Sequence, residues 1–157
     1  MTVDFNVLGR TEKGLLLFGA LSVLLTLFNR FETSTYHGKG INAVTVGQNA
    51  WNGVGVLGSL FLLAAFLITV GRIFANESLP VGPPWALIAV SGAVAGSLIL
   101  IVKGLTFDGG APMVTNAVAH MDAGPGWSGW LLFVASISFA VLTWLGFKEP
   151  DGRPTRS

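Results

Sequence analysis

The chain has 157 residues, of which 52% are hydrophobic and 11% charged, and its formal net charge is +1. That charge argues against a nucleic-acid partner, because a phosphate-binding surface needs clustered Lys and Arg. Cysteine is absent, which excludes disulfides, thiolate metal sites and cysteine nucleophiles. The apolar composition predicts one integral membrane domain over residues 1–157, with little mass outside the bilayer.

The first apolar run covers residues 14–28 and follows a short leader that carries Arg10 and Lys13. A positive leader before a short apolar run is also typical of a signal peptide. No small-x-small cleavage motif follows the run, however. We therefore expect an uncleaved first transmembrane span at about residues 12–31.

The loop after this span has the composition of a β-hairpin. Residues 31–36 and 41–46 are rich in β-branched and aromatic side chains, and the two glycines of His37-Gly-Lys-Gly40 between them suit a tight turn. A free two-stranded hairpin is only marginally stable, so it needs a surface to pack on.

The second long loop, residues 104–126, is the only comparable mass on the same side. We predict that the two loops pack into one small extracytoplasmic cap. In this cap we expect His37 at an exposed tip and four aliphatic side chains facing inward: Val44, Val46, Met113 and Val118.

The second span, about residues 50–74, gives the clearest membrane signal. Residues 50–71 contain no charged side chain, and as a helix they would extend about 33 Å, close to the roughly 30 Å of a hydrocarbon core. The run ends at Arg72, which can reach water.

The third span is predicted at about residues 85–102 and the fourth at 127–147, followed by a polar tail, residues 148–157. Gly92 and Gly96 form a GxxxG motif, which allows another helix to approach closely. Tryptophans mark the expected membrane interfaces: Trp51, Trp85, Trp127, Trp130 and Trp144.

The distribution of Lys and Arg predicts the topology. Six lie in the leader, around the turn between the second and third spans, and in the tail, whereas the two longer loops hold three. By the positive-inside rule, both termini are cytoplasmic in the plasma membrane and both longer loops face outward.

Titratable groups give little sign of chemistry within the spans. All eight acidic residues lie in the leader, loops or tail, and no Lys, Arg or His lies at mid-span, which argues against an ion-coupled transporter. A hydroxyl-lined path through Ser136, Ser138 and Thr69 remains an alternative, although such groups usually bond to their own helix.

Two histidines fall in the outward loops. A surface metal site could combine His37 and His120 with Asp122 and Met121, but no close histidine pair or HExxH motif occurs. We predict no metal, no cofactor and no catalytic residue, and we leave the roles of His37 and His120 open.

The layout of the chain resembles a known group. Asn49-Ala-Trp51 opens the second span, Gly126-Trp-x-x-Trp-Leu131 opens the fourth, and Lys148-Glu-Pro-Asp-Gly152 follows it. In this order of features the chain is similar to the small four-span membrane proteins of actinobacteria, most of which have no assigned function. The resemblance implies a plasma-membrane location and no known activity.

Taken together, the sequence predicts an all-α, four-helix transmembrane bundle with a small cap that contains a β-hairpin. We expect a non-enzymatic structural or accessory partner of a larger membrane assembly, in contact with lipid and with a protein partner or further copies of itself. Two alternatives remain: a small transporter or lipid-handling protein, and an extracytoplasmic metal-binding sensor.

Overall fold

The computed structural model describes residues 8–38, 41–75, 84–109 and 118–148. Within these ranges the protein is mostly helical, with a small sheet. In chain order the elements are α1 (Arg10–Thr26), β1 (Glu32–Gly38), β2 (Ile41–Gln48), α2 (Gly55–Phe74), α3 (Trp85–Leu105), β3 (Val118–Pro125) and α4 (Trp127–Lys148).

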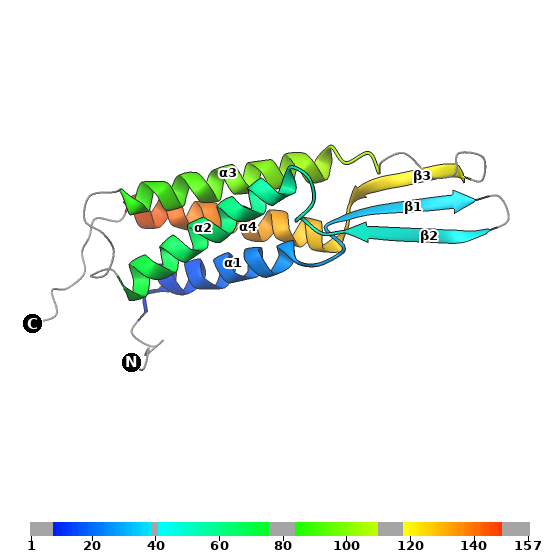
Figure 1. The fold of residues 1–157 in the computed structure, drawn as a ribbon. Coiled ribbons are helices and arrows are strands. Elements are labelled where there is room, and N and C mark those ends of the chain that lie inside the picture. The colour runs from blue at the N-terminus through cyan, green and yellow to red at the C-terminus, as the bar shows by residue number, and fades with distance from the viewer. Residues whose placement is uncertain (1–7, 39–40, 76–83, 110–117, 149–157) are drawn as a thin grey trace, which may run out of the picture.

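The four helices lie alongside one another, and the sheet extends from one end of them (Figure 1). The start of α1 and the end of α4 lie together at the opposite end. The most extensive helix contacts are those of α2 with α3 and of α1 with α4. The fold therefore has a helical body with the sheet at one end.

Three of the described helices, α2, α3 and α4, are long and apolar enough to cross a membrane by length and composition. The sequence predicted four. The difference is α1, which has 17 residues and ends at Thr26 rather than at residue 31. The hydroxyl of Thr26 donates to the carbonyl of Val23 at 2.6 Å and accepts from the Trp51 indole N–H at 2.9 Å.

The second predicted span also begins later than expected, at Gly55 rather than residue 50. The intervening residues turn the chain into the helix and attach it to the end of α1: the Ala50 N–H donates to the Thr26 carbonyl at 3.1 Å, and Gly53 takes a positive φ of 52°. In the other direction, α3 extends to Leu105 rather than ending at residue 102. Lys103 therefore lies in its last turn.

The predicted hairpin is confirmed as β1 and β2, and the predicted packing of the two loops is confirmed by β3. The strand order is β2-β1-β3, with both pairings antiparallel. The third strand was not expected, since the second loop, residues 104–126, contains several Gly and Pro residues that disfavour a strand. Each central residue of β1 has two partners: Ser34, for example, is opposite Val46 on one side and Ala123 on the other.

The predicted orientation of two valines is wrong. Val44 and Val46 are 54% and 49% exposed. They share a sheet face with Ser34 and Tyr36, whose hydroxyls donate to the Gly109 carbonyl at 3.4 and 3.5 Å. The segment at Gly109 thus covers β1 and leaves the valines of the edge strand exposed. Met113 and the side chain of Val118 lie outside the described part of the structure.

Small residues bring the helices together. A Cβ on Gly96 would lie 2.8 Å from the Gly58 carbonyl oxygen of α2, and one on Gly92 would lie 3.4 Å from the Cβ of Ala65. The Ser97 hydroxyl lies 3.1 Å from the Ser136 carbonyl of α4, so α3 contacts both neighbours through small side chains.

Candidate functional site

The helical body meets the sheet at a buried junction centred on Phe31. The Phe31 side chain is fully buried, and its ring packs edge-on against Phe133 of α4, with ring centroids 6.2 Å apart. The Phe31 N–H donates to the Gln48 carbonyl at 3.0 Å, and the Phe31 carbonyl accepts from the Gly126 N–H at 2.9 Å. The residue before β1 is thereby fixed by β2 and by the start of α4.

Two glycines make this close approach possible. A Cβ on Gly129 of α4 would overlap the carbonyl of Phe31, and one on Gly104 of α3 would lie 2.6 Å from the Phe133 ring. Both positions therefore need a residue without a side chain for the junction to close.

A buried ion pair lies beside Phe31. The Glu32 side chain is 1% exposed, and its Oε1 lies 3.2 Å from Nζ of Lys103, whose side chain is 16% exposed. The Lys103 ammonium also lies 5.3 Å from the centre of the Phe31 ring, a cation–π distance. The pair joins the first residue of β1 to the last turn of α3.

The surroundings of Glu32 disfavour its charged form. Burial raises the pKa of the Glu32 carboxyl above its usual range, and attraction to Lys103 lowers it by less. Among the described residues, neither Glu32 Oε1 nor Lys103 Nζ has a hydrogen-bond partner apart from their ion-pair contact. Chemically, the pair can anchor the sheet or take up a proton.

Sequence reasoning did not find this site. Glu32 was grouped with the loop acids and Lys103 was used only in the topology count, since each lies next to the end of an apolar run. One signal in the sequence could have indicated the pair. Glu32 follows the first apolar run and Lys103 follows the third, and in an antiparallel bundle these two runs end on the same side.

The proposed loop metal ligands are only partly brought together. Nε2 of His37 lies 3.2 Å from Oδ2 of Asp122, and both side chains are exposed, as expected for His37. His120 is opposite His37 in the β1–β3 register, and its side chain lies outside the described part of the structure. Met121 is opposite Tyr36, so it belongs to the other sheet face. No group of three potential metal-binding residues occurs among the described side chains.

The hydroxyls considered for a transport path bond to their own helices. Ser136 donates to the Phe133 carbonyl, Ser138 to that of Val134 and Thr69 to that of Ala65, at 3.2, 2.8 and 2.8 Å. Each hydroxyl proton is therefore already used in a hydrogen bond within its own helix, as is usual for hydroxyls in apolar helices.

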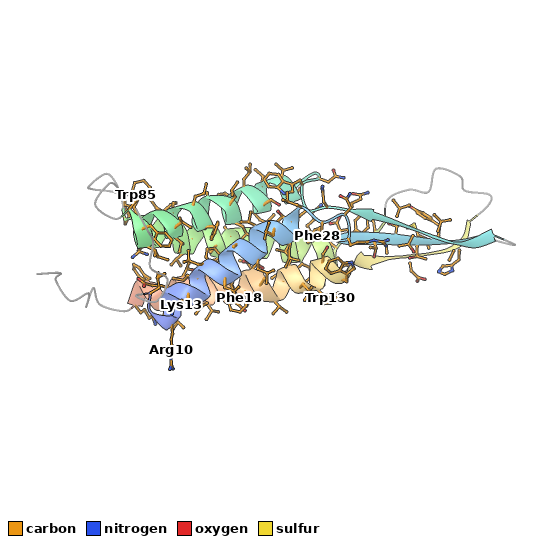
Figure 2. All side chains as sticks on the ribbon, turned by 90° about the horizontal axis from the view of Figure 1, so that it is seen from below. Arg10, Lys13, Phe18, Phe28, Trp85 and Trp130 are labelled. Atoms are coloured by element: carbon orange, nitrogen blue, oxygen red, sulfur yellow. The ribbon has the colours of Figure 1, made fainter. Side chains whose placement is uncertain are left out.

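The tryptophans lie near both ends of the helical body. Figure 2 shows Trp85 at the end that carries Arg10 and Lys13, and Trp130 with Phe28 beside the sheet. Trp127 contacts the Phe28 ring edge-on, and the Lys148 ammonium lies 4.9 Å from the Trp144 ring.

Comparison of the chain with family models, curated proteins and solved structures finds no match.

Proposed function

We propose that the chain is a non-enzymatic, four-span protein of the plasma membrane that serves as an accessory partner in a larger assembly. In this proposal both termini are cytoplasmic, and the sheet binds a protein partner on the outer side. Chemistry belongs to the assembly, and this chain supplies a membrane anchor with an outer docking element.

The distribution of side chains supports a lipid environment. Large apolar residues such as Leu17, Leu67 and Val134 are exposed, at 63%, 59% and 63%, whereas many hydroxyl residues are buried. A protein in water would favour the reverse, while helices in a bilayer associate through small and hydroxyl residues. The buried set of Ser and Thr is Ser22, Thr26, Ser34, Ser59, Thr69, Ser97, Ser128, Ser136 and Thr143.

Helix α1 is included as a fourth span because it packs against α4 and α2. Its charged residues are confined to its first turn, and Figure 2 shows Arg10 and Lys13 at one end of the body and Phe28 at the other. Residues 14–28 carry no charge between these ends. A helix that packs beside three spans and is apolar over this length is more stable in the bilayer than in water.

The edge strand β2 is the observation that best supports the accessory function. It pairs only with β1 among the described strands, so no described strand covers its other edge. Val44 and Val46 are exposed on one face of this edge. An exposed edge with apolar side chains is a template for a strand of another protein, and soluble proteins usually protect such edges with charge.

Photo-cross-linking in the native membrane tests the docking function. A photoreactive residue at position 44 or 46 should give a discrete protein adduct, whereas one at position 67, on the exposed face of α2, should not. The adduct mass distinguishes another protein from a second copy of the chain. Equal labelling at all three positions, or no protein adduct from the strand, would contradict the proposal.

A charge series makes the test quantitative. Val44→Lys with Val46→Lys should reduce partner recovery at least tenfold in mild detergent, because the two ammonium groups would lie on the apolar face that the partner covers, where buried charge is costly. Thr45→Lys, which lies on the opposite face of the same strand, is the matched control and should reduce recovery less. The same recovery from both variants would show that this face of β2 does not bind the partner.

A further inference from the structure

The two histidines of the chain meet at the far end of the sheet. His37, near the end of β1, and His120, near the start of β3, are directly opposite each other in the antiparallel register. Residues directly opposite in such a pair share one face of the sheet, with Cβ atoms about 4.5–5.5 Å apart. Figure 1 shows this end of the sheet pointing away from the helical body. The strand register thus brings together two residues that are far apart in the sequence.

Asp122 belongs to the same face as this pair. It follows His120 by two positions on β3, and residues two apart on a strand share a face. Its Oδ2 lies 3.2 Å from Nε2 of His37, across the two strands. Gly109, whose carbonyl accepts a hydrogen bond from Tyr36, lies over the opposite face. We call the group of His37, His120 and Asp122 the sheet triad.

The contact between His37 and Asp122 has the spacing of two ligands of one metal ion. In a tetrahedral site, an imidazole nitrogen and a carboxylate oxygen each lie about 2.0–2.2 Å from Zn²⁺, which places the two donors about 3.3–3.5 Å apart. The observed distance between the two donor atoms is 3.2 Å. The side chains are 46% and 65% exposed, so an ion in solution can reach both donors.

We propose that the sheet triad binds one divalent transition-metal ion, with His37, His120 and Asp122 as three ligands and water as the fourth. Two imidazoles and a carboxylate are typical ligands of Zn²⁺ and related first-row ions, whereas Ca²⁺ and Mg²⁺ favour oxygen ligands. Three protein ligands leave one coordination position open, so the bound ion can accept a further ligand from solution.

The site was not expected from the sequence, which contains neither a close histidine pair nor a HExxH motif. We predicted no metal for that reason. The pairing of β1 with β3 supplies the histidine pair without either motif. Met121 is not a ligand, because it belongs to the other face of the sheet. The site does not depend on the accessory function, since it lies on β1 and β3 rather than on the edge strand β2.

Zinc binding by the purified full-length protein tests the site. The protein is purified with a histidine-free tag, freed of metal with a chelator and titrated with Zn²⁺ in competition with a chromogenic indicator. One Zn²⁺ should bind per chain, and excess Mg²⁺ or Ca²⁺ should not displace it. The variants His37→Ala, His120→Ala and Asp122→Asn should each reduce zinc affinity by more than about tenfold, because even outer-shell partners of metal ligands account for about 10–100-fold.

Two further variants separate metal binding from the ion pair. Asp122→His removes the carboxylate but supplies another nitrogen ligand, so it should recover most of the zinc affinity that Asp122→Asn loses. Asp108→Asn is the matched control for charge, because Asp108 is an exposed acid beside Gly109, outside the triad. This control should bind zinc as the wild type does.

Wild-type zinc affinity in any of the variants His37→Ala, His120→Ala and Asp122→Asn would overturn the three-ligand site. So would a ratio of one Zn²⁺ to two chains, since the ion would then bridge two copies. Binding that Mg²⁺ displaces would also overturn it, because it would reflect attraction to charge alone. Far-UV circular dichroism checks that each variant keeps its sheet, and if His37→Ala loses it, the His120 and Asp122 variants decide. None of these outcomes alters the cross-linking expected at positions 44 and 46.

Discussion

Glu32 and Lys103 join the sheet to the helical body. The Glu32 carboxylate and the Lys103 ammonium lie 3.2 Å apart, and both side chains are largely buried. Glu32 is the first residue of β1, and Lys103 belongs to the last turn of α3. The contact therefore fixes the sheet to the helical body through side chains, whereas Phe31 fixes it through the backbone.

Removing one member of this pair should destabilise the protein more than removing both. Lys103→Gln leaves the Glu32 carboxylate buried without its partner and should reduce the free energy of unfolding by about 3 kcal/mol. Adding Glu32→Gln should recover part of that loss. Chemical unfolding in detergent, analysed as a double-mutant cycle, measures the coupling. Additive effects of the two substitutions would show that the pair does not act as a unit.

The pH dependence of stability should carry the signature of Glu32. Because burial raises the pKa of this carboxyl, the folded protein binds its proton more tightly than the unfolded chain. Between the unfolded pKa and the raised folded pKa, the contribution of Glu32 to the free energy of unfolding therefore falls as pH rises, and it stays low above that window.

Glu32→Gln is the control for this effect, since glutamine does not titrate. The stability of the wild type relative to this variant should decline from about pH 4 upward and then become constant. Thermal unfolding in detergent at a series of pH values measures the difference. A wild type that gains stability relative to the variant over the same range would contradict the assignment.

The contact between α2 and α3 should not tolerate bulk at Gly96. A Cβ there would lie 2.8 Å from the Gly58 carbonyl oxygen and 3.0 Å from Cγ of Leu62, so Gly96→Leu forces the helices apart. We expect a loss of about 1–3 kcal/mol in unfolding free energy in detergent. Val94→Leu, at an exposed position of the same helix, should change stability by less than about 0.5 kcal/mol. Equal effects would place the packing elsewhere.

The sequence predicted those elements of the fold whose signals lie within short stretches of the chain. Charge-free apolar runs indicated α2, α3 and α4, and two segments rich in β-branched and aromatic residues around two glycines indicated the β1–β2 hairpin. The ends of the helices were predicted less well. Thr26 stops α1 early because its groups bond to Ala50 and Trp51, residues that are distant in the chain.

The junction could not be predicted for the same reason. Nothing near Glu32 in the sequence shows that Lys103 is its partner, since the pairing depends on how α3 packs beside α4 and on the strand register. The orientation of Val44 and Val46 depended on which strand would lie at the edge. The edge position of β2 results from the pairing of β1 with β3, and the Gly and Pro residues of β3 make this strand hard to predict from the sequence.

Cysteine labelling can test the proposed topology. The chain contains no cysteine, so an introduced cysteine is the only thiol that can react. Thr45→Cys places a thiol on the edge strand, at an exposed position on the face away from Val44 and Val46, and Arg10→Cys places one at the opposite end of the body, where Figure 2 shows Arg10. In intact cells a membrane-impermeant maleimide should label the Thr45→Cys variant alone.

The Arg10→Cys variant should react only after the membrane is permeabilised, because the proposed topology, which rests on six of the nine Lys and Arg residues, places that end in the cytoplasm. Permeabilised cells, in which both variants should react, control for accessibility of the thiols. Labelling of the Arg10→Cys variant in intact cells, with the Thr45→Cys variant protected, would invert the topology. The sheet and its free edge would then face the cytoplasm, and the search for a partner would move to that side.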